Sequence, residues 1–132
     1  MSVSPFRVAG FDHIVLCVSD VAATCAFYGD VLGMTVREER PGKYSLQFGE
    51  NKISVQDAAS SPDIARDTVP GSGNFCLLSD TPVAEWRAHL ATQGVEIIDS
   101  GIRDGATGAI DSLYFRDPDG NLVEVSNRID RR

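Results

Sequence analysis

The chain has 132 residues, of which 12 are basic and 19 are acidic, so its formal net charge is −7. This length allows one domain with a buried core. The acidic balance argues against nucleic acid and anionic membranes as partners, because both select basic patches. No apolar run is long enough for a membrane-spanning helix.

The cysteines and the amino-terminal residues point to the same compartment. Cys17, Cys25 and Cys76 lie inside apolar periodic segments and have no CxxC spacing, which is typical of buried, reduced thiols. Residues 1–6 lack the charged start and apolar core of a secretory signal. We therefore expect a cytoplasmic protein.

The first half of the sequence predicts the element order β-α-β-β-β. Residues 11–18 alternate as a strand, and Ser19-Asp20 supplies the N-cap of a helix. Apolar residues at helical spacing run from Val21 to Leu32, with Gly33 as the C-cap. Three more strands follow, separated by turns, at residues 34–39, 44–48 and 52–57.

A long polar connection over residues 58–73 separates the two halves. The second half begins at Asn74 with another strand. A second helix then runs to Gly94, and we expect Thr81 to be its N-cap and Pro82 its first residue.

The end of the chain predicts three strands and two connections. Residues 95–99 form the first strand, and the glycine-rich segment 101–108 is either a flexible lid or a simple connector. Strands at 112–116 and 121–126 are joined by Asp117-Pro118-Asp119-Gly120. The two aspartates of this tetrapeptide resemble metal ligands, but a hairpin turn is the favoured interpretation.

The two halves repeat one plan of strand followed by helix. His13 stands as far before Gly33, the end of the first helix, as Asn74 stands before Gly94, the end of the second. Superposing the halves therefore puts Asn74 where the first half has His13. Equivalent strand positions of duplicated modules often contribute to one site, so this difference concerns the site directly.

Four predicted strands carry a polar side chain between aliphatic neighbours: His13, Gln56, Asn74 and Glu124. If the helices cover the aliphatic face, these four side chains lie on the opposite, concave face. A carboxylate in the middle of a strand is costly without a partner, and a divalent cation bound by His13 and Glu124 would supply one. Taken singly, each of the four is also an ordinary strand residue, and Glu124 could pair with Arg116 or face water.

Three segments resemble a known family. They are Asp12-His13-Ile14-Val15-Leu16, the run from Phe27 to Met34, and the run from Tyr114 to Val125. Together they resemble the vicinal oxygen chelate superfamily, which includes glyoxalase I, extradiol dioxygenases, fosfomycin resistance proteins and bleomycin resistance proteins. The resemblance covers nearly the whole chain. Within the superfamily it is strongest to single-domain glyoxalase-like proteins such as glyoxalase-domain-containing protein 5 of vertebrates.

The resemblance implies an α+β, glyoxalase-like fold. One domain over residues 1–132 would contain two tandem βαβββ modules, at about 8–57 and 72–127, whose curled mixed sheets surround a metal site. It also implies a divalent ion (Mn, Ni, Zn, Fe or Mg), a small-molecule substrate or ligand, and a homodimer. Whether the site lies within one chain or across the dimer interface stays open at this point.

By the same resemblance, His13 matches the ligand on the first strand and Glu124 matches the carboxylate ligand on the last. Gln56 matches the fourth-strand ligand, and Asn74 stands where many members have a second histidine. Neutral oxygens at Gln56 and Asn74 make the centre weaker than a full four-ligand site. Such a centre suits a loosely held ion such as Mg²⁺ or Mn²⁺, or a protein that has lost its metal.

Two functions remain open from the sequence. The first is a metal-dependent enzyme, of lyase or dioxygenase type, acting on a small oxygen-rich substrate. Its substrate contacts would be Tyr114, Arg116 and Arg103, and no residue is assigned a catalytic role. The second is a metal-free small-molecule-binding protein of the bleomycin-resistance type. The remaining histidine, His89, is expected at the surface of the second helix.

Overall fold

The computed structural model describes residues 4–60 and 65–129. The first half forms a four-stranded mixed sheet, sheet A, in the order β1-β4-β3-β2, with β1 parallel to β4. Helix α1 (Val21–Asp30) connects β1 to β2. The strands are β1 (His13–Val18), β2 (Thr35–Arg40), β3 (Lys43–Phe48) and β4 (Asn51–Asp57).

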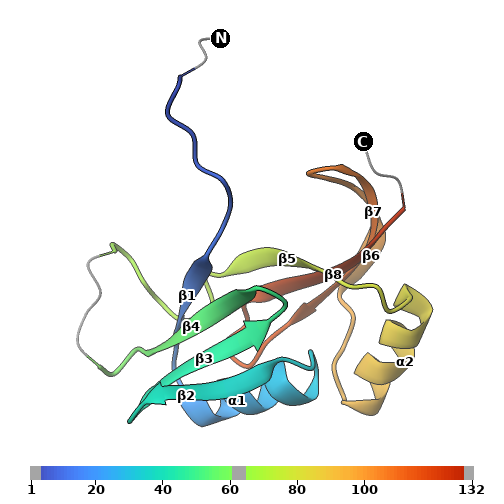
Figure 1. Ribbon diagram of the computed structural model, residues 1–132. Coiled ribbons are helices and arrows are strands. Elements are labelled where there is room, and N and C mark those ends of the chain that lie inside the picture. The colour runs from blue at the N-terminus through green and yellow to red at the C-terminus, as the bar shows by residue number, and fades with distance from the viewer. Residues whose placement is uncertain (1–3, 61–64, 130–132) are drawn as a thin grey trace.

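The second half repeats this topology as sheet B, in the order β5-β8-β7-β6, with β5 parallel to β8. Helix α2 (Val83–Thr92) connects β5 to β6, and both helices lie on the lower side of the two sheets in Figure 1. The predicted glyoxalase-like α+β fold is therefore confirmed. The strands are β5 (Asn74–Leu78), β6 (Asp99–Gly105), β7 (Gly108–Arg116) and β8 (Leu122–Arg128).

Helix α1 begins as its sequence predicts, but it ends at Asp30 with Val31 as its C-cap, and not at Leu32 with Gly33 as the cap. The Asp20 carboxylate accepts a hydrogen bond from the backbone N–H of Ala23 at 3.0 Å, which satisfies one of the unpaired donors of the first turn. After the helix, Gly33 has φ of 68°, a conformation that costs glycine little and other residues more.

Helix α2 is capped differently from the prediction. Thr81 is not its N-cap: the helix follows Pro82, and the cap residue makes no side-chain hydrogen bond to the first turn. Asn127 of β8 supplies the capping instead. Its Oδ1 accepts from the backbone N–H of Val83 at 2.9 Å, and its Nδ2 donates to the carbonyl of Thr81 at 2.8 Å. Sequence-local rules cannot find a cap that comes from another strand.

The glycine-rich segment is a tight hairpin of two paired strands and not an irregular connector. Strand β6 covers Asp99–Gly105 and β7 starts at Gly108, so the expected strand at 95–99 is displaced toward the C-terminus. A Cβ on Gly105 would lie 2.8 Å from the carbonyl oxygen of Gly108. The glycines are therefore needed because the two backbones approach closely.

The core lies between the helices and the aliphatic faces of both sheets, as the strand pattern predicts. Phe115 of β7 is fully buried, and its ring centroid lies 6.3 Å from that of Phe27 on α1, so the two modules share one core. Its buried members include Leu16, Val18, Tyr28, Leu46, Ile53, Val55, Leu90, Leu113, Val123 and Val125.

The segment between β7 and β8 forms the predicted turn. The buried Asp117 carboxylate accepts from the backbone N–H groups of Asp119 and Asn121 at 3.0 and 2.9 Å. Asp119 in turn accepts from Ser19, at the end of β1. Both aspartates therefore hold the turn and fasten it to the first module.

Three further observations concern the length of the helices, the exposure of the thiols and the segment before β1. No helix among the described residues is long and apolar enough to cross a membrane. Cys17, Cys25 and Cys76 are not joined in disulfides, but only the first two are half-buried, and Cys76 is exposed. Before β1, the chain leaves the body as an extended segment (Figure 1), in which Phe6, Val8 and Phe11 are almost fully exposed.

Candidate metal and substrate site

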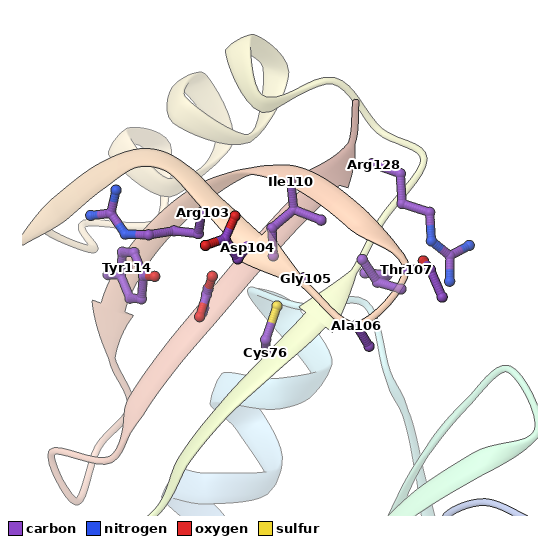
Figure 2. A pocket seen from close by; sticks show the side chains of 11 residues that line it. Cys76, Arg103, Asp104, Gly105, Ala106, Thr107, Ile110, Tyr114 and Arg128 are labelled. Carbon is purple, nitrogen blue, oxygen red and sulfur yellow. The ribbon is translucent and has the colours of Figure 1, made fainter. Parts of the chain in front are cut away.

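The open face of sheet B carries a cavity of about 520 Å³, here named the Glu124 cavity. Its floor is formed by β7 and β8, and its walls come from β5 and the β6–β7 hairpin (Figure 2). The lining residues are Cys76, Leu78, Arg103, Asp104, Gly105, Ala106, Thr107, Ile110, Tyr114, Glu124 and Arg128.

Glu124 is half-buried on the floor of this cavity and is held by hydroxyl groups. Ser112 Oγ donates to Glu124 Oε2 at 2.6 Å, and Ser126 Oγ lies 3.3 Å from the same oxygen. The Tyr114 hydroxyl also bonds to Glu124. Among the described residues, no cation forms an ion pair with Glu124, so its charge is unbalanced within one chain.

Cys76 stands opposite Glu124 on the neighbouring strand β5. Its Sγ lies 3.2 Å from Ser126 Oγ. Although the residue as a whole is exposed, partial desolvation of the thiol, and secondarily the nearby Glu124 carboxylate, raise the pKa of Cys76. The thiol is therefore protonated at neutral pH, because a raised pKa lies further above that pH. Cys76 is thus a weak donor at the β5 wall of the cavity and not a reactive thiolate.

Arg103 lies across the rim of the cavity and over an aromatic ring. Its guanidinium carbon is 5.4 Å from the ring centroid of Tyr114, and Nη2 is 3.3 Å from Asp99 Oδ2. Gly101 leaves the room for this arrangement, because a Cβ at that position would collide with the Arg103 guanidinium. Burial and the hydrogen bond to Glu124 raise the pKa of Tyr114, and Arg103 opposes this shift.

His13 lines a different cavity of about 620 Å³, here named the His13 cavity, which lies where β1 and β5 approach each other. Its Nδ1 is 2.8 Å from Asp12 Oδ1. A carboxylate at this distance favours the tautomer with the proton on Nδ1, which leaves the Nε2 lone pair available to a ligand. The cavity also contains Phe11, Ile14, Phe48, Lys52, Ile53, Phe75, Cys76, Leu77 and Leu78.

One chain does not bring the two strong candidate ligands together. The His13 and Glu124 cavities share only Cys76 and Leu78 among their lining residues. In residues 4–60 and 65–129, no group of three or more His, Cys, Asp or Glu side chains is arranged to hold a metal ion. His13 and Glu124 therefore line separate cavities of one chain, and their joint role in one metal centre stays a prediction.

Comparison with known proteins assigns the family. The model of the Glyoxalase/Bleomycin resistance protein/Dioxygenase superfamily matches residues 10–125. The chain belongs to this superfamily. It is 39% identical over 121 residues to virulence protein STM3117 of Salmonella typhimurium, covering 89% of this chain and 83% of that protein.

Two further proteins are similar to this chain. Biphenyl-2,3-diol 1,2-dioxygenase 3 of Rhodococcus globerulus is 35% identical over 138 residues, covering 95% of this chain and 64% of that enzyme. An integron cassette protein from the mobile metagenome of V. cholerae has a TM-score of 0.89 and 40% identity. That alignment covers 92% of this chain and 97% of the solved chain.

The strand register shows which residue of sheet A is equivalent to Glu124 of sheet B. Ser54 lies opposite Val15 in sheet A, and Glu124 lies opposite Cys76 in sheet B. Val15 and Cys76 are equivalent when the two halves are superposed. Ser54 is therefore the counterpart of Glu124, whereas the resemblance places the fourth-strand ligand at Gln56. The Ser54 side chain is buried, so sheet A offers a neutral hydroxyl where sheet B offers a carboxylate.

The other candidate residues lie outside both cavities. Asn74 is exposed at the start of β5, and neither it nor Gln56 lines the His13 or Glu124 cavity. Arg116 lines a third cavity, where its Nη1 donates to the carbonyl of Gly120 at 3.1 Å, so the suggested pairing with Glu124 is absent. His89 is half-buried and not at the surface, with Nε2 2.8 Å from the Val31 carbonyl.

Three residues of the site are not singled out by the sequence: Ser112, Ser126 and Cys76. Their signal is strand alternation, since Ser112 lies two positions before Tyr114 and Ser126 two positions after Glu124. They therefore share the face of their strands with residues that the sequence does single out. Short hydroxyl side chains on a strand carry no strong signal of their own, although here they hold the carboxylate.

Proposed function

We propose that the protein is a metal-dependent enzyme, of lyase or dioxygenase type, acting on a small substrate with adjacent oxygen atoms. The observation that carries this proposal is Glu124: a half-buried carboxylate, oriented by Ser112 and Ser126 toward an open cavity and lacking a cation among the described residues. Superfamily membership supports it, as does likeness to a relative named for an enzyme acting on a diol with neighbouring hydroxyls.

The chemistry of the candidate donors fits a divalent ion. His13 offers a neutral imidazole nitrogen, and Glu124 offers an anionic oxygen. Ser54, Asn74 and Gln56 line neither cavity, so neutral oxygens of water or of the substrate would complete the coordination. One carboxylate, one imidazole and neutral oxygens suit Mn²⁺ or Mg²⁺ better than a tightly held structural zinc. Such an ion would polarise adjacent substrate oxygens and stabilise negative charge that develops on them.

The protein's own groups would orient the substrate. Tyr114 donates to Glu124 and stands beside the cavity, so its hydroxyl fixes the carboxylate and limits how a ligand can approach it. Arg103, held over the Tyr114 ring, adds a cation at the rim. Ile110 and Leu78 provide apolar wall between these polar groups. The cavity therefore suits a small molecule with a hydrocarbon part.

We assign His13 and Glu124 to different protomers of a homodimer. Their cavities are separate in one chain, although both include the outward face of β5. The outward faces of β1 and β5 present Val15 and Leu78, which are 47% and 52% exposed. A second copy covering these faces would bury apolar surface and could bring one chain's His13 to the other chain's Glu124.

Metal titration tests the proposal. The full-length protein, stripped with a chelator, is titrated with Mn²⁺ by calorimetry. We expect one ion per chain, and His13→Ala and Glu124→Gln each weaken binding by about 100-fold or more, since losing a group that only orients a metal ligand already costs about 10–100-fold. Glu96→Gln, at an exposed carboxylate outside both cavities, is the matched control. No binding of Mn²⁺, Ni²⁺, Zn²⁺, Fe²⁺ or Mg²⁺ by the unaltered protein overturns the proposal.

Mixed dimers test the assignment to two chains. A heterodimer of His13→Ala and Glu124→Gln chains keeps one intact site if the ligands come from different protomers, because each defective chain contributes its unaltered ligand. It keeps no intact site if they come from the same chain. We expect half the metal stoichiometry of the unaltered dimer.

The second candidate function is a metal-free small-molecule-binding protein. Two observations favour it: the described residues of one chain contain no three-ligand cluster, and Asn74 stands where the repeat has His13. Under this function, ligand affinity would not change when the metal is removed or when His13 is replaced by alanine.

A further inference from the structure

Two arginines stand in one row across the mouth of the Glu124 cavity. Arg103 of β6 pairs with Ile110 of β7, and Ile110 pairs with Arg128 of β8. Residues paired in register point to the same face of a sheet. All three line the Glu124 cavity, and Figure 2 shows Arg103 and Arg128 on opposite sides of it.

The two guanidinium groups differ in their partners. The Arg103 guanidinium already has partners. It lies over the Tyr114 ring, is hydrogen-bonded to Asp99 and donates to the carbonyl of Ile102. Arg128 is exposed, and within the described parts of the chain it has neither an ion pair nor a side-chain hydrogen bond. Thr107, at the tip of the β6–β7 hairpin, lies on the same side of the cavity as Arg128 (Figure 2).

We infer that Arg128 and Thr107 form a carboxylate-binding subsite, so that the substrate of the proposed enzyme is a small organic acid. This inference rests on the proposed function, because it adds a second anchor to the same cavity. A guanidinium fork binds a carboxylate with two parallel hydrogen bonds, and a neighbouring hydroxyl can donate a third. One uncommitted positive charge matches a singly charged carboxylate better than a doubly charged phosphate group.

The spacing of the cavity defines the shape of the acid. Glu124 and Arg128 lie four positions apart on one face of β8, which separates their Cα atoms by about 13 Å. Ile110 and Leu78 line the cavity together with these two polar ends. The fitting ligand thus has adjacent oxygens at the Glu124 end, a short hydrocarbon or ring, and a carboxylate at the Arg128 end.

The charge of the whole chain makes this local cation significant. A net charge of −7 repels anions at long range, and Asp104 adds a further negative group to the cavity lining. An acidic ligand therefore needs a dedicated cation in contact with it. The same two arginines disfavour a cationic ligand in this cavity, which is the kind that the overall charge alone would attract.

A pair of ligands that differ only in the carboxylate tests the inference. Mn²⁺-loaded full-length protein is titrated by calorimetry with 3,4-dihydroxybenzoate and, separately, with 1,2-dihydroxybenzene. We expect the acid to bind at least about tenfold more tightly, the size of one charge-assisted hydrogen-bonded contact. In Arg128→Gln this preference disappears, while binding of 1,2-dihydroxybenzene stays within about twofold. Arg87→Gln, at an exposed arginine of α2, retains the preference and serves as the matched control.

Each outcome bears on a definite claim. Equal binding of the two compounds, binding of neither by the metal-loaded protein, or a preference that survives in Arg128→Gln overturns the carboxylate subsite. If the protein binds no metal, the proposed function fails separately. The same comparison in metal-free protein then decides the subsite, because the contact with Arg128 does not need the ion.

Discussion

The Tyr28 hydroxyl donates a hydrogen bond to Asp117 Oδ2 at 2.7 Å, across 89 positions of sequence. Tyr28 lies on helix α1 of the first module, and Asp117 begins the turn between β7 and β8 of the second. Both side chains are buried. Burial, reinforced by the Asp117 carboxylate, raises the pKa of Tyr28 strongly, so the phenol stays a donor at any physiological pH. The bond fixes one module against the other.

Replacing Tyr28 by phenylalanine tests this link. The ring would stay in the core, but Asp117 would lose one of its donors, so we expect a loss of about 1–3 kcal/mol in the free energy of unfolding. Urea denaturation followed by fluorescence measures it. Tyr44→Phe is the matched control, since the Tyr44 hydroxyl bonds to the exposed Glu38, and should cost clearly less. Equal losses in the two variants would show that the link has no special role.

The cap of α2 gives a prediction in which sequence and structure disagree. The sequence favours Thr81 as the cap, whereas in the structure Asn127 accepts from the first turn. We expect Asn127→Ala to lower the free energy of unfolding by about 1–2 kcal/mol, the usual loss of a cap. Thr81→Ala should change it little, because Thr81 makes its hydrogen bonds to Ser79 and Asn127 through its backbone. If thermal denaturation showed a larger loss for Thr81→Ala than for Asn127→Ala, Thr81 would be the cap, as the sequence predicts.

Most of the fold is predictable because the signals for the strands and for the start of α1 lie in residues that are close together in the sequence. Strand alternation and the cap at Asp20 need only neighbouring residues. The errors occur where contacts between strands decide, whether across a tight turn or far apart in the sequence. The glycine-rich segment looks like a loop until Gly105 is seen packed against Gly108, and Asn127 acts as a cap only after β8 reaches α2.

The candidate site is predictable in residue type but not in arrangement. Glu124 stands out from sequence because a charged side chain interrupts an aliphatic strand. Identifying the residue of sheet A that is equivalent to Glu124 requires the strand register. That register pairs Ser54 with Val15, so the equivalent residue is Ser54 and not Gln56. The separation of His13 from Glu124 also needs the structure, because strand pattern assigns a face and not a distance.

The pKa of Tyr114 should respond to Glu124. Burial raises that pKa most, and the hydrogen bond and negative charge of Glu124 raise it further, because both disfavour the tyrosinate. Glu124→Gln removes only the second contribution, so the pKa should fall while staying above its ordinary value. Conversely, Arg103→Gln removes a cation that favours the tyrosinate, so the pKa should rise. Carbon-13 NMR of labelled tyrosine rings against pH measures both shifts, and shifts of the same sign would contradict the arrangement.

The proposed dimer predicts a difference between two exposed aliphatic residues on opposite faces of sheet B. Leu78 is 52% exposed on the face that carries the Glu124 cavity, and Ile102 is 59% exposed on a strand position that alternates with Arg103, hence on the other face. A buried aspartate without a partner is costly at an interface. We therefore expect Leu78→Asp to weaken dimerisation by at least about tenfold, and Ile102→Asp to leave it nearly unchanged.

Sedimentation velocity over a range of protein concentrations measures this difference, and circular dichroism checks that both variants fold. If Ile102→Asp dissociates the dimer as strongly as Leu78→Asp, the interface lies elsewhere and His13 cannot reach a partner's Glu124 through the faces of β1 and β5. If Leu78→Asp alone produces monomers, Mn²⁺ binding should fall with dimer content, because each site needs both chains. Metal binding that persists in the Leu78→Asp monomer would instead show that His13 and Glu124 bind the ion within a single chain.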